Sequence, residues 1–299
     1  MSAEVWSTPT PAQWLAGARP RTLPAAVSPV LTGTGVAAYL GGFDAATALL
    51  ALVVSLALQV GVNYANDYSD GIRGTDHARV GPLRLVGSGL AKPASVKAAA
   101  FVAFGVAAVA GLAIVVLTGH WWLLAVGVAC VLAAWFYTGG TRPYGYLGLG
   151  EVFVFVFFGL VAVCGTTYVQ LGRVPLPAVV ASVGIGALAC AILVANNLRD
   201  IVGDRVAGKR TLATRLGDPA TRRLYVGLAG VAALCVGGVA VLTTPWALLG
   251  LAGFALLAPA IRGVVTGAVG PALIAVLKAT GSAELAVAAA LALGLVIGA

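Results

Sequence analysis

The sequence predicts an all-α, polytopic membrane protein with about nine transmembrane helices, forming one domain over residues 1–299. Hydrophobic residues make up 60% of the 299 positions and charged residues only 9%, a balance that a soluble globular protein does not show. The apolar residues are grouped in successive runs long enough to cross a bilayer. Basic residues gather in alternate connections between these runs, as the positive-inside rule expects of a multi-pass protein.

The spans follow from the apolar runs, whose ends are blurred where glycine and proline interrupt them. In chain order we expect them at 23–41, 45–66, 95–117, 121–138, 149–170, 177–197, 222–242, 246–264 and 279–298. Most connections are short, but those over 71–93 and 206–219 are long. Long connections among short ones tend to be functional lids, so these two are the first candidates for substrate contacts.

The basic residues orient the chain. With nine spans, Arg19, Arg21, both long connections, Arg142, Arg262 and Lys278 fall on one side, whereas the other side holds only Arg173. The positive-inside rule then places the N-terminus in the cytoplasm and both long connections on the cytoplasmic face. We therefore expect a protein of a bacterial plasma membrane with the lipid bilayer as its surroundings. The net charge of +8 is explained by orientation, and we expect no nucleic-acid partner.

Two acidic clusters each close an apolar run. The first holds Asn63, Asn66, Asp67, Asp70 and Asp76. Helical spacing pairs Asn63 with Asp67 and Asn66 with Asp70, on neighbouring stripes of one helix. Carboxylates this close repel one another, and at the edge of a membrane they need a cation; oxygen ligands of this kind suit Mg²⁺.

The second cluster holds Asn196, Asn197, Asp200 and Asp204, and repeats the Asn-x-x-x-Asp spacing. Arg73 and Lys209 lie within a turn or two of the acids. A polyphosphate bound through Mg²⁺ requires carboxylates for the metal and cations for the remaining oxygens, and both are present. The alternative is that the acids only pair with adjacent arginines at the membrane surface. Four cysteines and two histidines show no ligand spacing, which argues against a zinc-type site.

The motif Asn66-Asp67-x-x-Asp70, together with Asp200-x-x-x-Asp204 and the following Ala-Gly-Lys-Arg-Thr-Leu at 207–212, resembles the two signatures of the UbiA-type intramembrane prenyltransferases. The resemblance extends over nearly the whole chain, including residues 18–24 and 137–140. Within that family, the segment 66–84 is similar to the branch that prenylates 1,4-dihydroxy-2-naphthoate in menaquinone synthesis. Five residues separate Asp70 from Asp76 where many relatives have three, and this branch shares the longer spacing.

The resemblance implies nine spans around a central cavity and two Mg²⁺ ions that bridge a polyprenyl diphosphate to both aspartate motifs. It implies transfer of the polyprenyl chain to an aromatic acceptor at the carbon bearing its carboxylate, with loss of CO₂. The metal ligands it implies are Asn66, Asp67, Asp70, Asp76, Asn196, Asp200 and Asp204. The substrate contacts are Asn63, Asn66, Arg73, Arg79, Arg84, Arg142, Asn197 and Lys209. The catalytic residues are Asp67, Asp70, Asp200, Asp204 and Tyr137.

Several alternatives stay open at the level of sequence. Tyr137, Tyr144 and Tyr146 lie on or just beyond the fourth span and are candidates to shield a carbocation. Glu151, at the start of the next span, is either solvated at the surface or an acid of the site.

The function also has alternatives. The aromatic acceptor can be 4-hydroxybenzoate or homogentisate in place of 1,4-dihydroxy-2-naphthoate. A secondary transporter would place its acids near the bilayer midplane, and an alcohol phosphotransferase has a signature that the segment after Asp70 does not follow. Prenyl length and oligomeric state are not determined.

Overall fold

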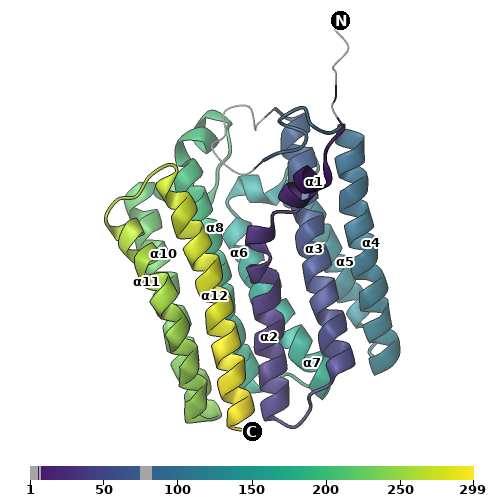
Figure 1. The fold of residues 1–299 in the computed structure, drawn as a ribbon, viewed down its shortest axis with the longest axis vertical. Helices are drawn as coiled ribbons and strands as arrows, with labels where there is room; N and C mark the ends of the chain where they lie inside the picture. Colours follow the sequence, from purple (N-terminus) through teal and green to yellow (C-terminus); the bar gives the residue numbers. More distant parts are fainter. Residues whose placement is uncertain (1–5, 7, 75–82) are drawn as a thin grey trace, which may run out of the picture.

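The computed structural model describes residues 6, 8–74 and 83–299, and these segments contain helices and no strand. The helices run roughly along one common direction and form a bundle (Figure 1). In chain order they are α1 (Pro11–Gly17), η1 (Pro20–Thr22), α2 (Pro24–Tyr39), α3 (Ala45–Ile72), α4 (Pro93–Thr118), α5 (Leu123–Phe136), η2 (Tyr144–Leu147), α6 (Gly150–Val154), the π-helical η3 (Phe155–Cys164), α7 (Gly165–Leu171), α8 (Leu176–Val206), α9 (Leu212–Leu216), α10 (Asp218–Leu242), η4 (Pro245–Gly253), α11 (Phe254–Val265) and α12 (Ala272–Ile297).

The prediction of an all-helical, multi-pass membrane protein is confirmed. Within the described residues, seven helical stretches are long and apolar enough to cross a bilayer: Ala45–Ile72, Pro93–Thr118, Gly150–Leu171, Leu176–Val206, Asp218–Leu242, Pro245–Val265 and Ala272–Ile297. The first and fourth predicted spans coincide with α2 and α5, which have 16 and 14 residues. Because a span needs about 20 residues, these two helices do not confirm the count of nine.

Helices α3 and α8 continue beyond the ends that hydropathy predicted. The N-terminus of α3 is fixed by Asp44, whose carboxylate accepts a hydrogen bond from the Thr47 amide at 2.7 Å. From there the helix runs to Ile72, six residues past the apolar run, and α8 runs nine residues past its own, to Val206. Hydropathy marks the apolar part of a helix, not its end, and the acidic residues from Asn63 to Asp70 and from Asn196 to Asp204 therefore lie on helices.

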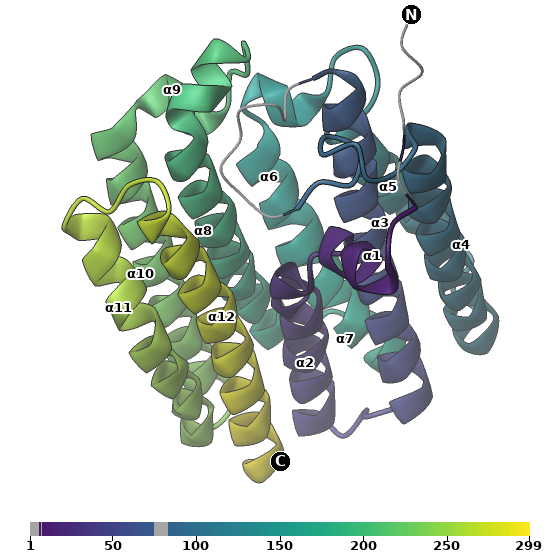
Figure 2. The same ribbon diagram turned by 45° about the horizontal axis from the view of Figure 1, so that its top comes forward.

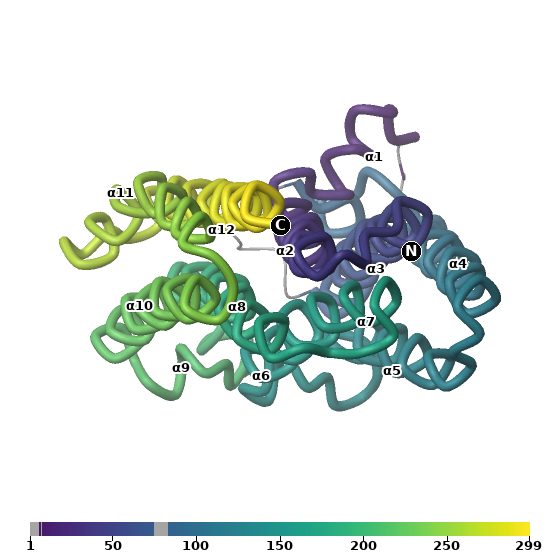
Figure 3. Tube along the Cα trace, turned by 90° about the horizontal axis from the view of Figure 1, so that it is seen from below, coloured from purple at the N-terminus to yellow at the C-terminus, as the bar shows by residue number. Residues whose placement is uncertain are grey.

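The bundle has two buried cores. The larger one surrounds α8, which packs against α10 and α12 and is filled by side chains such as Leu188, Tyr225 and Leu257. The smaller one lies between α3, α4 and the connection that follows α3, and includes Tyr64, Leu85 and Phe104. Helices α10, α11 and α12 lie on one side and α3, α4 and α5 on the other, with α2 and α6 between them (Figures 2 and 3).

Candidate functional site

The C-terminal ends of α3 and α8 lie at the same end of the bundle, together with α1 and α9 (Figures 1 and 2). Each of these two helices ends in one of the acidic clusters. The expectation that both clusters lie on one side of the membrane protein is therefore confirmed by the topology. The cytoplasmic side itself remains a prediction, since it rests on the distribution of basic residues.

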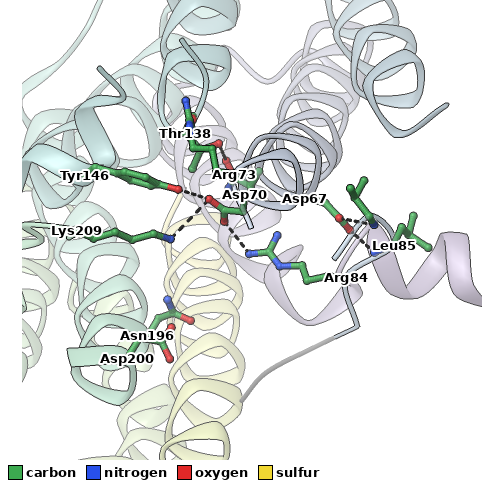
Figure 4. Close-up of polar contacts among 12 residues, drawn as sticks. Asp67, Asp70, Arg73, Arg84, Leu85, Thr138, Tyr146, Asn196, Asp200 and Lys209 are labelled. Carbon is green, nitrogen blue, oxygen red and sulfur yellow. Dashed lines mark hydrogen bonds and ion pairs between the residues drawn. The ribbon is translucent and has the colours of Figure 1, made fainter. Parts of the chain in front are cut away.

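Asp70 is the centre of a group of polar side chains that come from three parts of the chain. Its carboxyl group is buried, with only 3% of the residue exposed. The Tyr146 hydroxyl donates a hydrogen bond to Oδ1. The Lys209 Nζ lies 3.6 Å from Oδ1, and the Arg84 Nη2 lies 3.2 Å from Oδ2 (Figure 4). The cations that balance this carboxylate thus come from both long connections, as expected of a site that these connections cover.

Tyr146 holds the cations in place through its ring. The Lys209 Nζ lies 4.5 Å from the ring centroid, and the guanidinium carbon of Arg73 lies 5.5 Å from it. Arg73 also donates to the backbone carbonyls of Thr138 and Gly140. The backbone carbonyl of Tyr146 accepts a hydrogen bond from the Arg210 amide at 2.9 Å, which ties the connection after α5 to the one after α8.

The sequence patterns indicated Tyr146 only as an aromatic ring, and Thr138 only as part of the stretch 137–140. The Thr138 hydroxyl donates to the Oδ1 of Asn66 at 2.7 Å, one turn before Asp70. Thr138 and Tyr146 belong to the segment 137–149, in which only the short helix η2 is regular, so hydrophobic periodicity does not indicate how they are placed. The available signal was the stretch 137–140 of the family resemblance, which contains Thr138 and lies shortly before Tyr146.

The second cluster lies on α8. Both oxygens of Asp200 accept hydrogen bonds from Arg199 at 2.7 Å, and the same guanidinium donates to Asn196 Oδ1 at 2.9 Å. The backbone carbonyl of Asp204 accepts the Lys209 amide at 2.8 Å, so the end of α8 positions this lysine. Asn196 and Asp200 point into the same region as Lys209 and Asp70 (Figure 4). Pairing with an adjacent arginine therefore holds for Asp200, whereas the charge partners of Asp70 come from distant segments.

Asp67, which the sequence predicts as a metal ligand, has backbone partners in the structure. Its carboxylate is directed away from Asp70, and its two oxygens accept hydrogen bonds from the backbone amides of Leu85 and Val86 at 2.7 and 3.0 Å (Figure 4). Only 1% of the residue is exposed. A Cβ on Gly71 would lie 2.4 Å from Val86, so the connection packs directly on α3. Asp67 thus fixes the segment next to Arg84, which in turn meets Asp70.

This role of Asp67 predicts a loss of stability on truncation. Asp67→Ala leaves two buried amides without an acceptor, at a cost of about 1–3 kcal/mol each. We expect its thermal unfolding midpoint in detergent to fall well below that of the wild type. Asp67→Asn keeps one acceptor oxygen and should fall in between. An Asp67→Ala protein that unfolds at the wild-type temperature would contradict the role in anchoring residues 85 and 86.

The remaining predicted residues are distributed as follows. The side-chain amide of Asn63 donates to the Ala18 carbonyl and to the Thr22 hydroxyl, both at 2.9 Å, so Asn63 anchors the N-terminal segment. Asn197 donates to the Oε1 of Glu151 at 2.9 Å.

Tyr137 follows the last residue of α5 and contacts Tyr144 edge to face, with 5.5 Å between the ring centroids. Arg142 is exposed, and Asp76 and Arg79 lie outside the described residues.

Burial keeps the phenol of Tyr144, which contacts the Tyr137 ring, uncharged. The Tyr144 side chain lies in the connection after α5, and burial raises its pKa above the usual value for tyrosine. Its hydroxyl donates to the backbone carbonyl of Ala133 at 2.7 Å, which fixes the ring at the end of α5. The ring that Tyr137 contacts is therefore a rigid, uncharged surface.

The oxygen donors at this end of the bundle fit Mg²⁺. Among residues 6, 8–74 and 83–299, no three acidic, histidine or cysteine side chains come close enough to hold a metal by themselves. Mg²⁺ is commonly held by only one or two carboxylates, with substrate phosphates and water completing its octahedron. Asn66 and Asp70 on α3, and Asn196, Asp200 and Asp204 on α8, supply two such partial sets. They suit an ion that arrives with a polyphosphate.

Comparison with known proteins places this arrangement in a family. The sequence model of the UbiA prenyltransferase family matches residues 26–268. The chain belongs to the UbiA prenyltransferase family. A 1,4-dihydroxy-2-naphthoate octaprenyltransferase from Mycobacterium tuberculosis is 55% identical over 287 residues, which are 95% of this chain and 98% of that protein. The protein of the same name from Escherichia coli is 39% identical over 229 residues, covering 75% of this chain and 74% of that protein.

Solved UbiA structures share the fold. A UbiA homologue from Archaeoglobus fulgidus bound to DMAPP and Mg²⁺ superposes with a TM-score of 0.65, covering 95% of this chain and 99% of that one at 15% sequence identity. Membership of the UbiA family confirms the resemblance that the two aspartate motifs suggested. The structure adds which of the motif residues face each other across the bundle.

Proposed function

We propose that this UbiA protein transfers a polyprenyl chain from polyprenyl diphosphate to 1,4-dihydroxy-2-naphthoate, with loss of CO₂, in a reaction that depends on Mg²⁺. The observation that carries the proposal is the convergence of Asp70, Lys209 and Arg84 opposite the acids of α8. Carboxylates and cations at one end of a membrane bundle form a receptor for a metal-bound diphosphate whose chain extends between the helices. In this proposal the 299 residues form one prenyltransferase domain.

Each group has a defined task in this proposal. Asn66 and Asp70 would hold one Mg²⁺ ion, and Asn196, Asp200 and Asp204 a second. These ions would supply positive charge where the departing diphosphate becomes more negative. Lys209 and Arg84 neutralise Asp70 in the free protein and are within reach of phosphate oxygens once the diphosphate is bound. Arg73, held over Tyr146, is the third cation of this set.

The acceptor is proposed from the relatives and from the chemistry of the site. The proteins from M. tuberculosis and E. coli, which cover 95% and 75% of this chain, are both named for 1,4-dihydroxy-2-naphthoate. The side chains near the diphosphate group include the aromatic rings of Tyr137, Tyr144 and Tyr146, which suit an aromatic acceptor and a carbocation. The positive charge at this end supports an active site on the cytoplasmic face of a bacterial plasma membrane.

Removal of the metal provides the direct test. Detergent-purified protein, polyprenyl diphosphate and 1,4-dihydroxy-2-naphthoate should give the demethylmenaquinone product with added Mg²⁺. With excess EDTA we expect the rate to fall to background, because the diphosphate loses both the ions that bind it and those that stabilise its departure. Product is measured by chromatography and mass spectrometry.

Two outcomes would change the proposal. Product from 4-hydroxybenzoate alone would keep the reaction and replace the acceptor. Full activity in EDTA would contradict the metal site at Asp70 and Asp200. Because the assay uses detergent-solubilised protein, it also separates an enzyme from a transporter, which requires a sealed membrane.

A further inference from the structure

Glu151 is a buried acid that none of the proposed metal or diphosphate contacts uses. It lies in the first turn of α6, and only 8% of the residue is exposed. Its Oε1 accepts a hydrogen bond from Asn197 at 2.9 Å, and its backbone carbonyl contacts the Cys190 Sγ at 3.1 Å. Helix α8 therefore holds both the backbone and the side chain of Glu151 in a fixed position.

The second carboxylate oxygen of Glu151 lacks a partner. Its Oε2 is buried and accepts no hydrogen bond from any part of the chain that the structure describes. Buried polar atoms in native proteins are nearly always paired, and an exception requires an explanation. An oxygen that is fixed, buried and unpaired next to a functional site is well placed to accept a hydrogen bond from a bound molecule.

The distance from the diphosphate site suits the second substrate. Asn197 precedes Asp200 by three residues on α8, which is about 4.5 Å along the helix axis and on the same face. The carbon that reacts in a prenyl diphosphate is bonded directly to a diphosphate oxygen. The acceptor ring must therefore lie next to the metal-bound diphosphate, and Asn197 holds Glu151 one turn of α8 from the Asp200 that is proposed to bind the metal.

The Tyr137 ring lies next to the start of α6. A Cβ on Gly150 would lie 3.5 Å from the Tyr137 hydroxyl, so the start of α6 passes next to this ring. Tyr144 stacks on Phe153 with 3.9 Å between the ring centroids. Glu151 therefore lies at the start of α6, next to the point where this helix passes the Tyr137 ring, and its partner Asn197 lies one turn of α8 from Asp200.

We propose that Glu151 binds a ring hydroxyl of the aromatic acceptor and takes up its proton during prenyl transfer. This inference rests on the proposed function. The ring carbon that bears the carboxylate forms a bond to the allylic carbon, whose bond to the diphosphate oxygen breaks with the electron pair leaving on the diphosphate. The adjacent hydroxyl becomes a carbonyl as its proton passes to the Glu151 carboxylate.

Loss of CO₂ completes the step and restores the acid. The electron pair of the bond to the departing CO₂ returns to the ring, and the carbonyl oxygen takes its proton back from Glu151. The proton is therefore borrowed and returned, and no further reactant is needed. Asn197 is a positioning residue here, because it orients the carboxylate without touching the reacting atoms.

The test compares the acceptor with analogues that lack one ring hydroxyl. Binding is measured by calorimetry on the Mg²⁺-loaded protein, in the presence of a prenyl thiolodiphosphate that does not react. In the wild type, removal of the hydroxyl next to the carboxylate should weaken binding about ten- to a hundredfold, as expected for a hydrogen bond to a charged group. Removal of the other hydroxyl should have a smaller effect. If neither hydroxyl matters, the proposal is wrong, and this comparison needs no variant.

The variant E151Q provides the second arm. We expect it to bind the full acceptor more weakly by a similar factor and to show no further loss with the analogue. Its turnover should fall about 10²–10⁴-fold, the range for loss of a general base, while its affinity for the thiolodiphosphate stays within about twofold. Equal losses for both substrates would indicate a structural role and would overturn the proposal.

Glu284 provides the matched control. It is the other glutamate inside the bundle, on α12, fully buried and with neither carboxylate oxygen paired among the described residues. E284Q makes the same chemical change away from α6, and acceptor binding should keep its dependence on the hydroxyl. Loss of that dependence in E284Q would overturn the assignment to Glu151. A wild type that binds both substrates without forming product would instead count against the proposed function.

Discussion

Asp200→Asn is expected to reduce turnover by about 10²–10³-fold or more and to leave the protein folded, with a lower unfolding midpoint because the buried Arg199 loses its charged partner. The charge of Asp200 serves the metal-bound diphosphate in the proposed reaction, and removal of one group that stabilises charge in a transition state has effects of this size. The carboxamide has the same shape and can still accept a hydrogen bond from Arg199, which contacts Asp200 at 2.7 Å. The measurement is kcat with saturating Mg²⁺, together with the thermal unfolding midpoint.

The chain contains a suitable control for this substitution. Asp218 also forms an ion pair with an arginine on its own helix, with 2.6 Å between its Oδ1 and the Arg222 Nε, but at the start of α10 and with its side chain about half exposed. Asp218→Asn should leave turnover close to the wild-type value. Equal activity of Asp200→Asn and Asp218→Asn would remove α8 from the proposed metal site.

Helical periodicity predicted which residues of the first cluster share a face. It placed Asn63 with Asp67 on one stripe of α3 and Asn66 with Asp70 on the next. In the structure the two stripes do face different surroundings: Asn66 and Asp70 meet Thr138 and Tyr146, whereas Asn63 and Asp67 meet other segments. The periodicity does not predict which of the two stripes faces the site, because this depends on the segments that pack on the helix.

The contacts that the sequence did not indicate, those of Asp67, Tyr146 and Thr138, have the same physical cause. Asp67 has the residue type and spacing of a metal ligand, yet its charge is used by the amides of Leu85 and Val86. Tyr146 and Thr138 lie in an irregular connection whose path is set by contacts with Arg73, Lys209 and Asn66. Long apolar helices and acidic clusters are local patterns and were predicted, while contacts between distant connections depend on tertiary packing.

Asp70→Asn should abolish activity and destabilise the free protein more than Asp200→Asn does, because the Asp70 carboxylate meets two cations. Lys209 and Arg84 lie 3.6 and 3.2 Å from the Asp70 carboxylate, and all three side chains are at least 87% buried. Removal of one partner of a buried ion pair leaves an uncompensated charge, at a cost of about 3–5 kcal/mol. We therefore expect a lower unfolding midpoint in detergent without Mg²⁺, and no stabilisation by Mg²⁺ with polyprenyl diphosphate, because binding raises the midpoint only when the site is intact.

A second substitution separates the two roles of Asp70. In Asp70→Asn/Lys209→Met the unbalanced ammonium group is absent, so part of the lost stability should return, while activity stays at background because neither the metal carboxylate nor the diphosphate cation is restored. The interaction energy between the two sites follows from the double-mutant cycle, with Lys209→Met as the other single variant. Additive effects on the unfolding midpoint would show that Asp70 and Lys209 do not balance each other in the free protein. Recovery of activity in the double variant would contradict the role of Asp70 in holding the metal, since a charge balance alone would then be sufficient for the reaction.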